Sequence, residues 1–356
     1  MFPAEAMAQE LKRRGRRVLL VTDERGDRYA GSFPCDEKFL IAAGSPNVGG
    51  PVRKALAAAA IAGGLIKSLQ EFRRRGVDIA VGFGGYPSLP SMKAAELLKI
   101  PFGVHEQNAV LGRSNRLLAR GASFLAHAFP ELDRAPAGVK ARVEVGNPVR
   151  DAVAALAGAP YPAPDIEGEL RILVFGGSQG ATVFSRSVPS AVAALPETIR
   201  LRLKIVQQAR EADLDDVKAG YAGIGVDADI ATFFADLPQR MRDAHLVIAR
   251  SGASTVTELS AIGRPSVLVP LPIAMDDHQA GNARALSDVG AAIMLREGPG
   301  FDAGLASALG KLLANPAELA LMAGKAQGRV KSGAAAALAD LVDRLLAERN
   351  RREEAA

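Results

Sequence analysis

Short apolar runs alternate with helical patterns along this chain, and no other feature restricts its fold as strongly. The runs expected as strands in the first half are Arg17–Thr22, Ile79–Val81, Phe102–His105, Ser123–His127 and Val143–Val145. Those expected in the second half are Arg171–Phe175, Leu203–Val206, Leu246–Ala249, Val267–Pro270 and Ala292–Leu295. Apolar strands separated by helices are typical of parallel sheets that are covered on both faces. The sequence therefore predicts an α/β chain.

The alternation occurs twice, which predicts two doubly wound domains with a cleft between them. A length of 356 residues agrees with two domains. The stretch 157–168, rich in Pro, Ala and Gly, is expected as a linker. We place the first domain at 1–150, the second at 151–330, and a C-terminal helix at 331–350 that packs back on the first. Ligands of such sheets bind at the carboxyl ends of the strands.

Composition restricts the partners of the chain. A single cysteine and four histidines predict no metal site, and no apolar run is long enough to span a membrane. Residues 1–150 carry 23 basic and 14 acidic residues, a net charge of +9, whereas residues 151–356 carry 21 and 25, a net charge of −4. The basic half indicates an anionic partner such as a phosphate or an acidic lipid surface. Only 5% of residues are aromatic, which argues against nucleic acid.

A glycine-rich turn, Phe175–Ala181 (FGGSQGA), follows a predicted strand and precedes a helix. Glycines let a phosphate approach the backbone, the helix start supplies N–H donors, and Ser178 can add a hydroxyl. The alternative is a plain tight turn. The next strand ends in Gln207 and Gln208 rather than in an acid, so the dinucleotide fingerprint is absent.

Two further helix starts in the second half are candidate sites. Arg250–Glu258 (RSGASTVTE) follows a strand, and Glu258 can either accept ribose hydroxyls or form a capping box with Thr255. In 270–283, Gln279 and Asn282 have amides that suit sugar hydroxyls. The alternative for this segment is a surface helix capped by Asp276 or Asp277.

The first half also places polar groups after strands. His105–Asn108 (HEQN) is either a site or a buried, satisfied hydrogen-bond cluster. Gly82–Ser88 is a second glycine-rich turn, and Arg150 follows the last strand. Arg53–Arg75 is a helical pattern with an apolar stripe bracketed by basic residues, which either binds an anionic membrane or packs on the sheet.

These motifs in this order resemble the MurG family, the UDP-N-acetylglucosamine transferases of peptidoglycan synthesis. The motifs that carry the resemblance are GGYPS, HEQN, GNPVR, GGSQGA, RSGASTVTE and DHQAGNA. The resemblance implies a GT-B glycosyltransferase fold with two Rossmann-like doubly wound domains. It also implies transfer of N-acetylglucosamine from UDP-N-acetylglucosamine to lipid I, which forms lipid II with inversion. The expected location is the cytoplasmic face of the inner membrane, with peripheral attachment and no required cofactor.

The resemblance assigns roles to individual residues. It places the diphosphate at Ser178 and at the helix start, the ribose at Glu258, and the transferred sugar at Gln279. The full expected donor set is Asn108, Arg150, Ser178, Phe234 (for the uracil), Ala253, Ser254, Thr255, Val256, Thr257, Glu258, Gln279 and Asn282. The acceptor side is expected at Tyr86, Glu106 and Asn115.

One departure from the family pattern concerns the start of the sequence. The family begins with a strand and a loop GGTGGH, whereas Met1–Ala4 matches the residues that come directly after that histidine. The histidine often proposed as the catalytic base would lie upstream of Met1, so the catalytic base is left unassigned. Two alternatives therefore stay open: an inactive sugar-nucleotide-binding remnant, and a nicotinamide-dependent oxidoreductase that would use Asp23 and Glu24.

Overall fold

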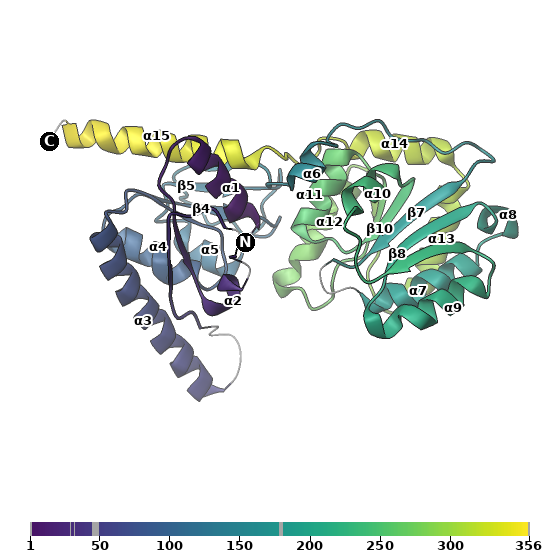
Figure 1. The fold of residues 1–356 in the computed structure, drawn as a ribbon, viewed down its shortest axis with the longest axis horizontal. Coiled ribbons are helices and arrows are strands. Elements are labelled where there is room, and N and C mark those ends of the chain that lie inside the picture. The colour runs from purple at the N-terminus through teal and green to yellow at the C-terminus, as the bar shows by residue number, and fades with distance from the viewer. Residues whose placement is uncertain (1, 29, 32, 45–49, 178–180, 355–356) are drawn as a thin grey trace. The chain divides into compact units, whose positions relative to one another are not determined.

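The computed structural model describes residues 2–28, 30–31, 33–44, 50–177 and 181–354 (Figure 1). It divides the chain into two compact units, which are described separately. Unit 1 is Met1–Pro148 with Gly333–Ala356, and unit 2 is Val149–Ser332. The expected divisions at 150 and 330 each lie two residues from these boundaries. None of the described helices has the length and apolarity needed to cross a bilayer.

Unit 1 contains two separate parallel sheets. The first pairs β1 (Leu19–Thr22) with β2 (Glu37–Leu40), with Leu19 opposite Glu37. The second has the order β3-β4-β5-β6. Its strands are β3 (Ala80–Gly82), β4 (Phe102–Glu106), β5 (Phe124–His127) and β6 (Arg142–Glu144). Every residue of β4 and β5 is buried, as expected for central strands of a parallel sheet.

Helices cover the sheets of unit 1. They are α1 (Phe2–Arg13), α2 (Glu24–Asp27), α3 (Pro51–Arg75), α4 (Ser88–Leu97), α5 (Arg113–Leu118) and α15 (Ala334–Glu354). The C-terminal α15 packs on α1, where Met7 joins Leu338 and Val342 in one apolar cluster. Arg14, just after α1, donates to Asp340 at 2.7 Å and to Asp343 at 2.9 Å. The two ends of the sequence therefore belong to the same unit.

Unit 2 is one six-stranded parallel sheet in the order β12-β11-β10-β7-β8-β9. Its strands are β7 (Leu170–Phe175), β8 (Leu203–Gln208), β9 (Asp227–Ala231), β10 (Leu246–Ala249), β11 (Ser266–Leu268) and β12 (Ala292–Met294). Its helices are α6 (Asp151–Ala154), α7 (Thr182–Ala193), α8 (Glu197–Arg200), α9 (Leu214–Ala222), α10 (Leu237–Asp243), α11 (Ala253–Ile262), α12 (His278–Ser287), α13 (Phe301–Leu313) and α14 (Pro316–Ala326). Two 3₁₀ turns, η1 (Glu211–Asp213) and η2 (Met275–Asp277), precede α9 and α12.

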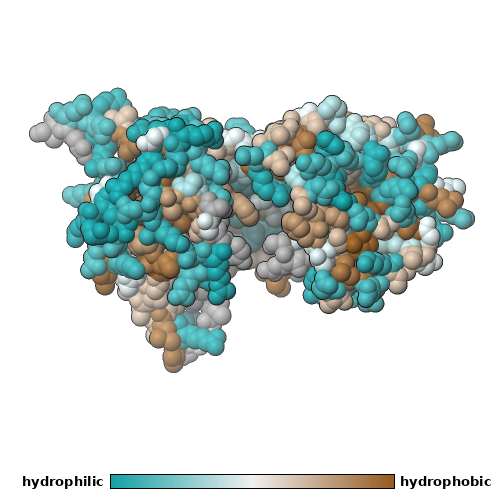
Figure 2. All heavy atoms as spheres, viewed as in Figure 1, coloured by the Kyte–Doolittle hydropathy of each residue, from teal (hydrophilic) through white to brown (hydrophobic). Residues whose placement is uncertain are grey.

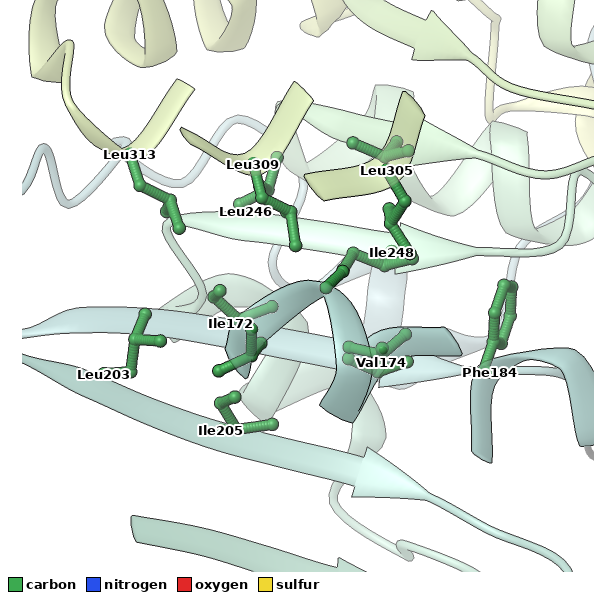
Figure 3. Packing of buried hydrophobic residues seen from close by; sticks show 14 of the residues in the cluster. Ile172, Val174, Phe184, Leu203, Ile205, Leu246, Ile248, Leu305, Leu309 and Leu313 are labelled. Carbon is green, nitrogen blue, oxygen red and sulfur yellow. The ribbon is translucent and has the colours of Figure 1, made fainter. Parts of the chain in front are cut away.

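The core of unit 2 forms where the central strands meet α7 and α13 (Figure 3). Ile172 of β7 and Ile248 of β10 are at most 1% exposed, and so is Leu309 of α13. Burying an aliphatic side chain of this size contributes roughly 1.5–3 kcal/mol. This packing fixes the central strands. The loops after β7, β10 and β11 are therefore anchored at the ends of rigid strands.

The ten expected strands are all present, with ends that shift by one or two residues. Two strands, β2 and β9, were not predicted. Each lies at the edge of its sheet. β2 (EKFL) begins with two charged residues and buries Phe39, whereas no residue of β9 (DADIA) is buried, so neither is a continuous apolar run. Asp227 and Asp229 lie on β9 and pair with Lys204 and Arg240 respectively.

Candidate active site

Three neighbouring strands of unit 2 bring the predicted donor motifs to one edge of its sheet. β11, β10 and β7 are adjacent and parallel, so the loops that leave their carboxyl ends lie side by side. Those loops lead into α12, α11 and α7 respectively. This is the edge at which ligands bind to open α/β sheets.

The glycine-rich loop after β7 is partly described. Gly177 has a positive φ of 83°, which a residue with a side chain adopts only with strain. Ser178 lies outside the described residues. The Gly176 N–H donates to the side chain of Gln208 at 3.2 Å, and Gln208 in turn donates to the Thr232 carbonyl at 3.1 Å. Gln208, the last residue of β8, thus ties this loop to the one after β9.

Helix α11 starts with Gly252 as its N-cap residue, in extended conformation and without a side-chain cap. The Val256 N–H makes the first intrahelical bond, to Gly252 at 3.0 Å. The N–H groups of Ala253, Ser254 and Thr255 therefore form the donor end of the helix. Of the five residues expected to bind phosphate, Val256 and Thr257 have buried side chains, and the Thr257 hydroxyl donates to the Ala253 carbonyl.

Glu258 is the sixth residue of α11 and therefore lies in its second turn. The capping-box alternative with Thr255 is wrong, since a capping box requires the acid in the first turn. The Glu258 side chain is only 8% exposed, yet both of its oxygens accept from Arg150, at 3.1 and 2.9 Å. Burial raises the pKa of Glu258, and the Arg150 guanidinium opposes that rise. A buried carboxylate at this edge is a strong acceptor.

Arg150 lies just before α6 with its side chain 46% exposed. Because its guanidinium is partly exposed, Arg150 can release the Glu258 carboxylate when a ligand hydroxyl donates to that carboxylate. It can also turn toward a bound anion such as a phosphate. Arg150 and Glu258 are 108 residues apart in the sequence, so no local pattern indicated that they pair.

The start of α12 holds the remaining predicted amides. Gln279 is partly exposed, and its side-chain oxygen accepts from the Leu271 N–H at 3.0 Å. Asn282 is fully buried and donates to the Ser251 carbonyl at 3.1 Å, so it braces the loop before α11. Asp277 occupies the N-cap position of α12, but its carboxylate bonds Arg296 instead of capping the helix.

Arg250 was not predicted as a site residue, although it lies at the end of β10. Its guanidinium donates to the carbonyls of Val269 and Pro270, contacts the carboxylate of Glu297, and stacks over Phe184. These contacts fix the loop after β11 relative to the loop after β10. The only hint in the sequence was a basic residue at a strand end, because its partners are all distant.

Phe234, expected at the uracil pocket, lies in the loop after β9. It is 8% exposed, and the Arg240 guanidinium covers its ring at 4.3 Å from the centroid. Its backbone is therefore a better candidate for base recognition than its ring. The neighbouring Phe233, which was not predicted, is 74% exposed.

In unit 1, the carboxylate of Glu106 is surrounded by donors. One oxygen accepts from the backbone and side chain of Asn108, at 3.0 and 3.1 Å. The other accepts from the Gly112 N–H and the Asn115 amide, both at 2.9 Å. Four donors on a carboxylate that is 4% exposed match the alternative of a satisfied hydrogen-bond cluster.

The second glycine-rich turn connects β3 to α4. Gly84 and Gly85 both have positive φ, at 78° and 74°, and the Ser88 hydroxyl donates to the Gly84 carbonyl at 2.6 Å. A side chain on Gly84 would start 3.3 Å from the Asn115 amide. Tyr86 is partly exposed at the tip of this turn. Tyr86 therefore lies in a turn that contacts Asn115, and Asn115 in turn donates to Glu106.

His105, next to Glu106, is fully buried. One ring nitrogen contacts the Gly146 carbonyl at 3.0 Å, and the other contacts the Gln107 amide at 3.1 Å. Burial lowers the pKa of His105 to about 4, so the ring is neutral at neutral pH. A second buried histidine, His245 in unit 2, has its pKa lowered to about 4 for the same reason.

We expect acid to destabilise the chain through these histidines. Below their ordinary pKa of 6.5 the unfolded chain binds protons that the folded chain does not, so stability falls as the pH drops from about 6.5 to 4. Each histidine should remove up to about 3 kcal/mol of unfolding free energy by pH 4. Urea unfolding at several pH values measures how the unfolding free energy depends on pH. The His105→Gln substitution should remove the share of that pH dependence that is due to His105. An unchanged stability between pH 7 and 5 would contradict this account.

Comparisons with known proteins agree on one family. Residues 1–126 match the glycosyltransferase family 28 N-terminal domain, and residues 171–344 match the family 28 C-terminal domain. A protein of Methylorubrum extorquens is 46% identical over 98% of this chain and 93% of its own length. One of Rhodospirillum centenum is 49% identical, over 96% and 90% respectively. Both are named UDP-N-acetylglucosamine--N-acetylmuramyl-(pentapeptide) pyrophosphoryl-undecaprenol N-acetylglucosamine transferase.

Solved structures lead to the same group. The crystal structure of Acinetobacter baumannii MurG superposes with a TM-score of 0.81 at 31% identity, covering 96% of this chain and 95% of that one. UDP-GlcNAc 2-epimerase from Neisseria meningitidis, at 12% identity and a TM-score of 0.63, shares the fold alone. Two α/β units with parallel sheets and these domain matches define a glycosyltransferase of the GT-B fold. The chain belongs to the MurG family of N-acetylglucosamine transferases.

The family membership decides between the functional alternatives. It supports the transferase and not the nicotinamide-dependent oxidoreductase or the inactive remnant. The acids that suggested a nicotinamide site have another explanation. Asp23 caps the short helix α2 by accepting from the Gly26 N–H at 2.9 Å, and it also bonds Arg25.

Proposed function

We propose that this chain transfers N-acetylglucosamine from UDP-N-acetylglucosamine to the 4-hydroxyl of the muramyl sugar of lipid I. The product is lipid II, and the anomeric carbon of the transferred sugar is inverted. The observation that carries the proposal is the near full-length identity of 46–49% to transferases named for this reaction.

On the donor side, the proposal assigns the leaving diphosphate to the start of α11 and to the loop after β7. The reaction develops negative charge on UDP, and the N–H groups of Ala253, Ser254 and Thr255 stabilise that charge together with the helix dipole. Glu258 accepts the ribose hydroxyls, and Gln279 contacts the transferred sugar. Asn282 and Arg250 act indirectly, because they hold the loops that carry these groups.

On the acceptor side, the proposal keeps Tyr86, Glu106 and Asn115 but changes their roles. Glu106 already accepts four hydrogen bonds, so it positions the loop that carries Asn108 and does not take a proton. Asn115 links that loop to the glycine-rich turn of Tyr86. Tyr86, partly exposed at its tip, is the member of this group best placed to touch an acceptor.

A direct assay tests the proposed reaction. The purified chain is incubated with UDP-N-acetylglucosamine labelled in the sugar and with lipid I, and the lipid product is separated and identified by mass. The expected product is lipid I plus one N-acetylhexosamine. UDP-N-acetylgalactosamine, which differs at one hydroxyl, serves as the control donor. Equal transfer from both donors would argue against a sugar site built around Gln279.

We also infer that α3 attaches unit 1 to an anionic membrane surface. The apolar side chains of α3 lie on two faces of the helix. Leu65, Leu69 and Phe72 pack into the core, whereas Val52, Leu56 and Ile66 are 56–72% exposed. Basic residues flank the exposed face, namely Arg53, Lys54 and Lys67. Figure 2 shows apolar side chains gathered over the projecting end of α3, where a solvated helix would be polar.

Substitution on that face should weaken membrane binding. The change is Leu56→Glu with Ile66→Glu, and we expect at least a tenfold lower partition coefficient, because each side chain loses about 1.5–3 kcal/mol of apolar burial. Sedimentation with phosphatidylglycerol vesicles measures the bound fraction. Ile166→Glu, at a residue that is 81% exposed in unit 2, is the matched control and should bind normally. Equal binding of all three proteins would rule out α3 as the membrane contact.

A further inference from the structure

The turn between β11 and α12 holds two consecutive residues in a backbone conformation that side chains disfavour. Asp276 and Asp277 both have a φ of 55°, in the left-handed region. Aspartate visits this region as single residues rather than in succession, and such strain persists only where the surrounding structure holds it. Apolar packing contributes little here, because Ile273 is 87% exposed and Met275 is 48% exposed. Polar contacts must therefore fix this turn.

One of those polar contacts comes from a residue that is distant in the sequence. Arg296, which follows β12, donates to both carboxylate oxygens of Asp277, at 3.2 and 2.7 Å. Two parallel N–H groups on one carboxylate fix its direction as well as its position. Asp277 occupies the N-cap position of α12 without capping the helix, so its carboxylate is available to Arg296. The pair therefore fixes the start of α12 relative to the end of β12.

The segment that carries Arg296 is itself anchored. On one side of it, the Leu295 N–H donates to the Leu268 carbonyl at 2.9 Å, which continues the pairing of β12 with β11. On the other side, the carboxylate of Glu297 contacts Arg250, whose side chain is only 12% exposed. The backbone at Arg296 is therefore held by β11 and by the end of β10.

The strained turn determines where Gln279 lies. The Gln279 side-chain oxygen accepts from the Leu271 N–H at 3.0 Å, which directs the amide NH₂ group away from that contact. Leu271 is connected to Asp277 through two backbone bonds of 3.0 Å: the Ala274 N–H donates to Leu271, and the Asp277 N–H donates to Ala274. The direction in which Gln279 can donate therefore depends on the turn that Arg296 holds.

We propose that Arg296 is a positioning residue of the donor site. Its ion pair with Asp277 holds the turn before α12 in the conformation that directs the Gln279 amide to the transferred sugar. This inference rests on the proposed function, in which Gln279 contacts that sugar. UDP itself is assigned to other groups, namely the start of α11 and Glu258. Arg296 therefore serves recognition of the N-acetylhexosamine and not of the nucleotide.

Calorimetry with UDP-N-acetylglucosamine and with UDP tests the proposal. In Arg296→Ala we expect the sugar nucleotide to bind about three- to tenfold more weakly, while UDP affinity stays within about twofold. Unfolding should be unchanged, because both side chains of the pair are about half exposed. Arg296→Lys, which keeps the charge but loses the two-point contact, should give an intermediate loss. Arg242→Ala, which removes an exposed arginine paired with Asp243 in the same unit, is the control and should change neither affinity.

A double-mutant cycle separates positioning from direct contact with the ligand. Asp277→Asn keeps a side chain that tolerates positive φ but removes the charge that Arg296 binds. If Arg296 acts through Asp277, adding Arg296→Ala to Asp277→Asn should weaken binding of the sugar nucleotide by less than about twofold more. Losses that simply multiply in the double variant would show that Arg296 acts by another route, and would overturn the proposal.

Two further results would also overturn it. One is an unchanged affinity for both ligands in Arg296→Ala, and the other is an equal loss for both. Failure of the proposed function has a different appearance, because the unchanged chain would then bind neither UDP-N-acetylglucosamine nor UDP. That result would overturn both proposals, whereas normal binding by the unchanged chain with no selective loss in Arg296→Ala would overturn only the role of Arg296.

Discussion

Replacing Glu258 with glutamine should weaken UDP binding about 10- to 100-fold. The change keeps the size of the side chain but replaces the carboxylate with an amide, and a hydrogen bond to a charged group contributes about 1.5–3 kcal/mol. The chain contains no tryptophan, so calorimetry is a better measurement than intrinsic fluorescence. Glu169→Gln, at an exposed carboxylate in the same unit, is the matched control. Unchanged UDP affinity in a folded Glu258→Gln protein would remove Glu258 from the donor site.

Arg150→Ala tests the same site through pH. Arg150 opposes the burial-induced rise in the pKa of Glu258, so its removal should raise that pKa further. Protonated Glu258 is a weaker acceptor. UDP affinity in Arg150→Ala should therefore fall more steeply between pH 8 and 6 than in the unchanged chain. Parallel pH dependences in calorimetry would show that Arg150 does not control the ionisation of Glu258.

Glu106→Ala should destabilise unit 1 by about 3–5 kcal/mol. The substitution leaves buried donors on Gly112 and Asn115 without their acceptor, and each such group costs about 1–3 kcal/mol. The loss in unfolding free energy is measured by denaturant titration, with limited proteolysis used to follow the unfolding of unit 1. Glu131→Ala, at an exposed acid in the same unit, should stay within about 0.5 kcal/mol of the unchanged chain.

Glu106→Gln separates a positioning role from a catalytic one. If Glu106 positions the loop, this variant should lose stability, and its activity per folded molecule should fall less than tenfold. A general base would instead give a loss of about 10²–10⁴ in kcat with normal stability. A large loss in kcat with normal stability would show that Glu106 takes the proton of the acceptor hydroxyl.

Local sequence patterns predicted where the donor-side loops lie, but they did not predict how the acceptor-side residues are hydrogen-bonded. A glycine-rich turn or a polar helix start after an apolar strand is visible in a few consecutive residues, and strand order then brings three such loops together. The state of each side chain was not predictable in this way. Glu106 has the same sequence signal whether its carboxylate is open or holds four donors, and only the path of 108–115 decides between them.

The sequence by itself determined the alternation of strands and helices, the two units and the positions of the glycine turns, because these depend on side-chain size and periodicity over short windows. Tertiary structure alone decided that Arg150 holds Glu258 and that Arg250 and Asn282 brace loops. Those features join residues that are far apart in the chain. Their energies depend on burial and direction, which no local pattern records.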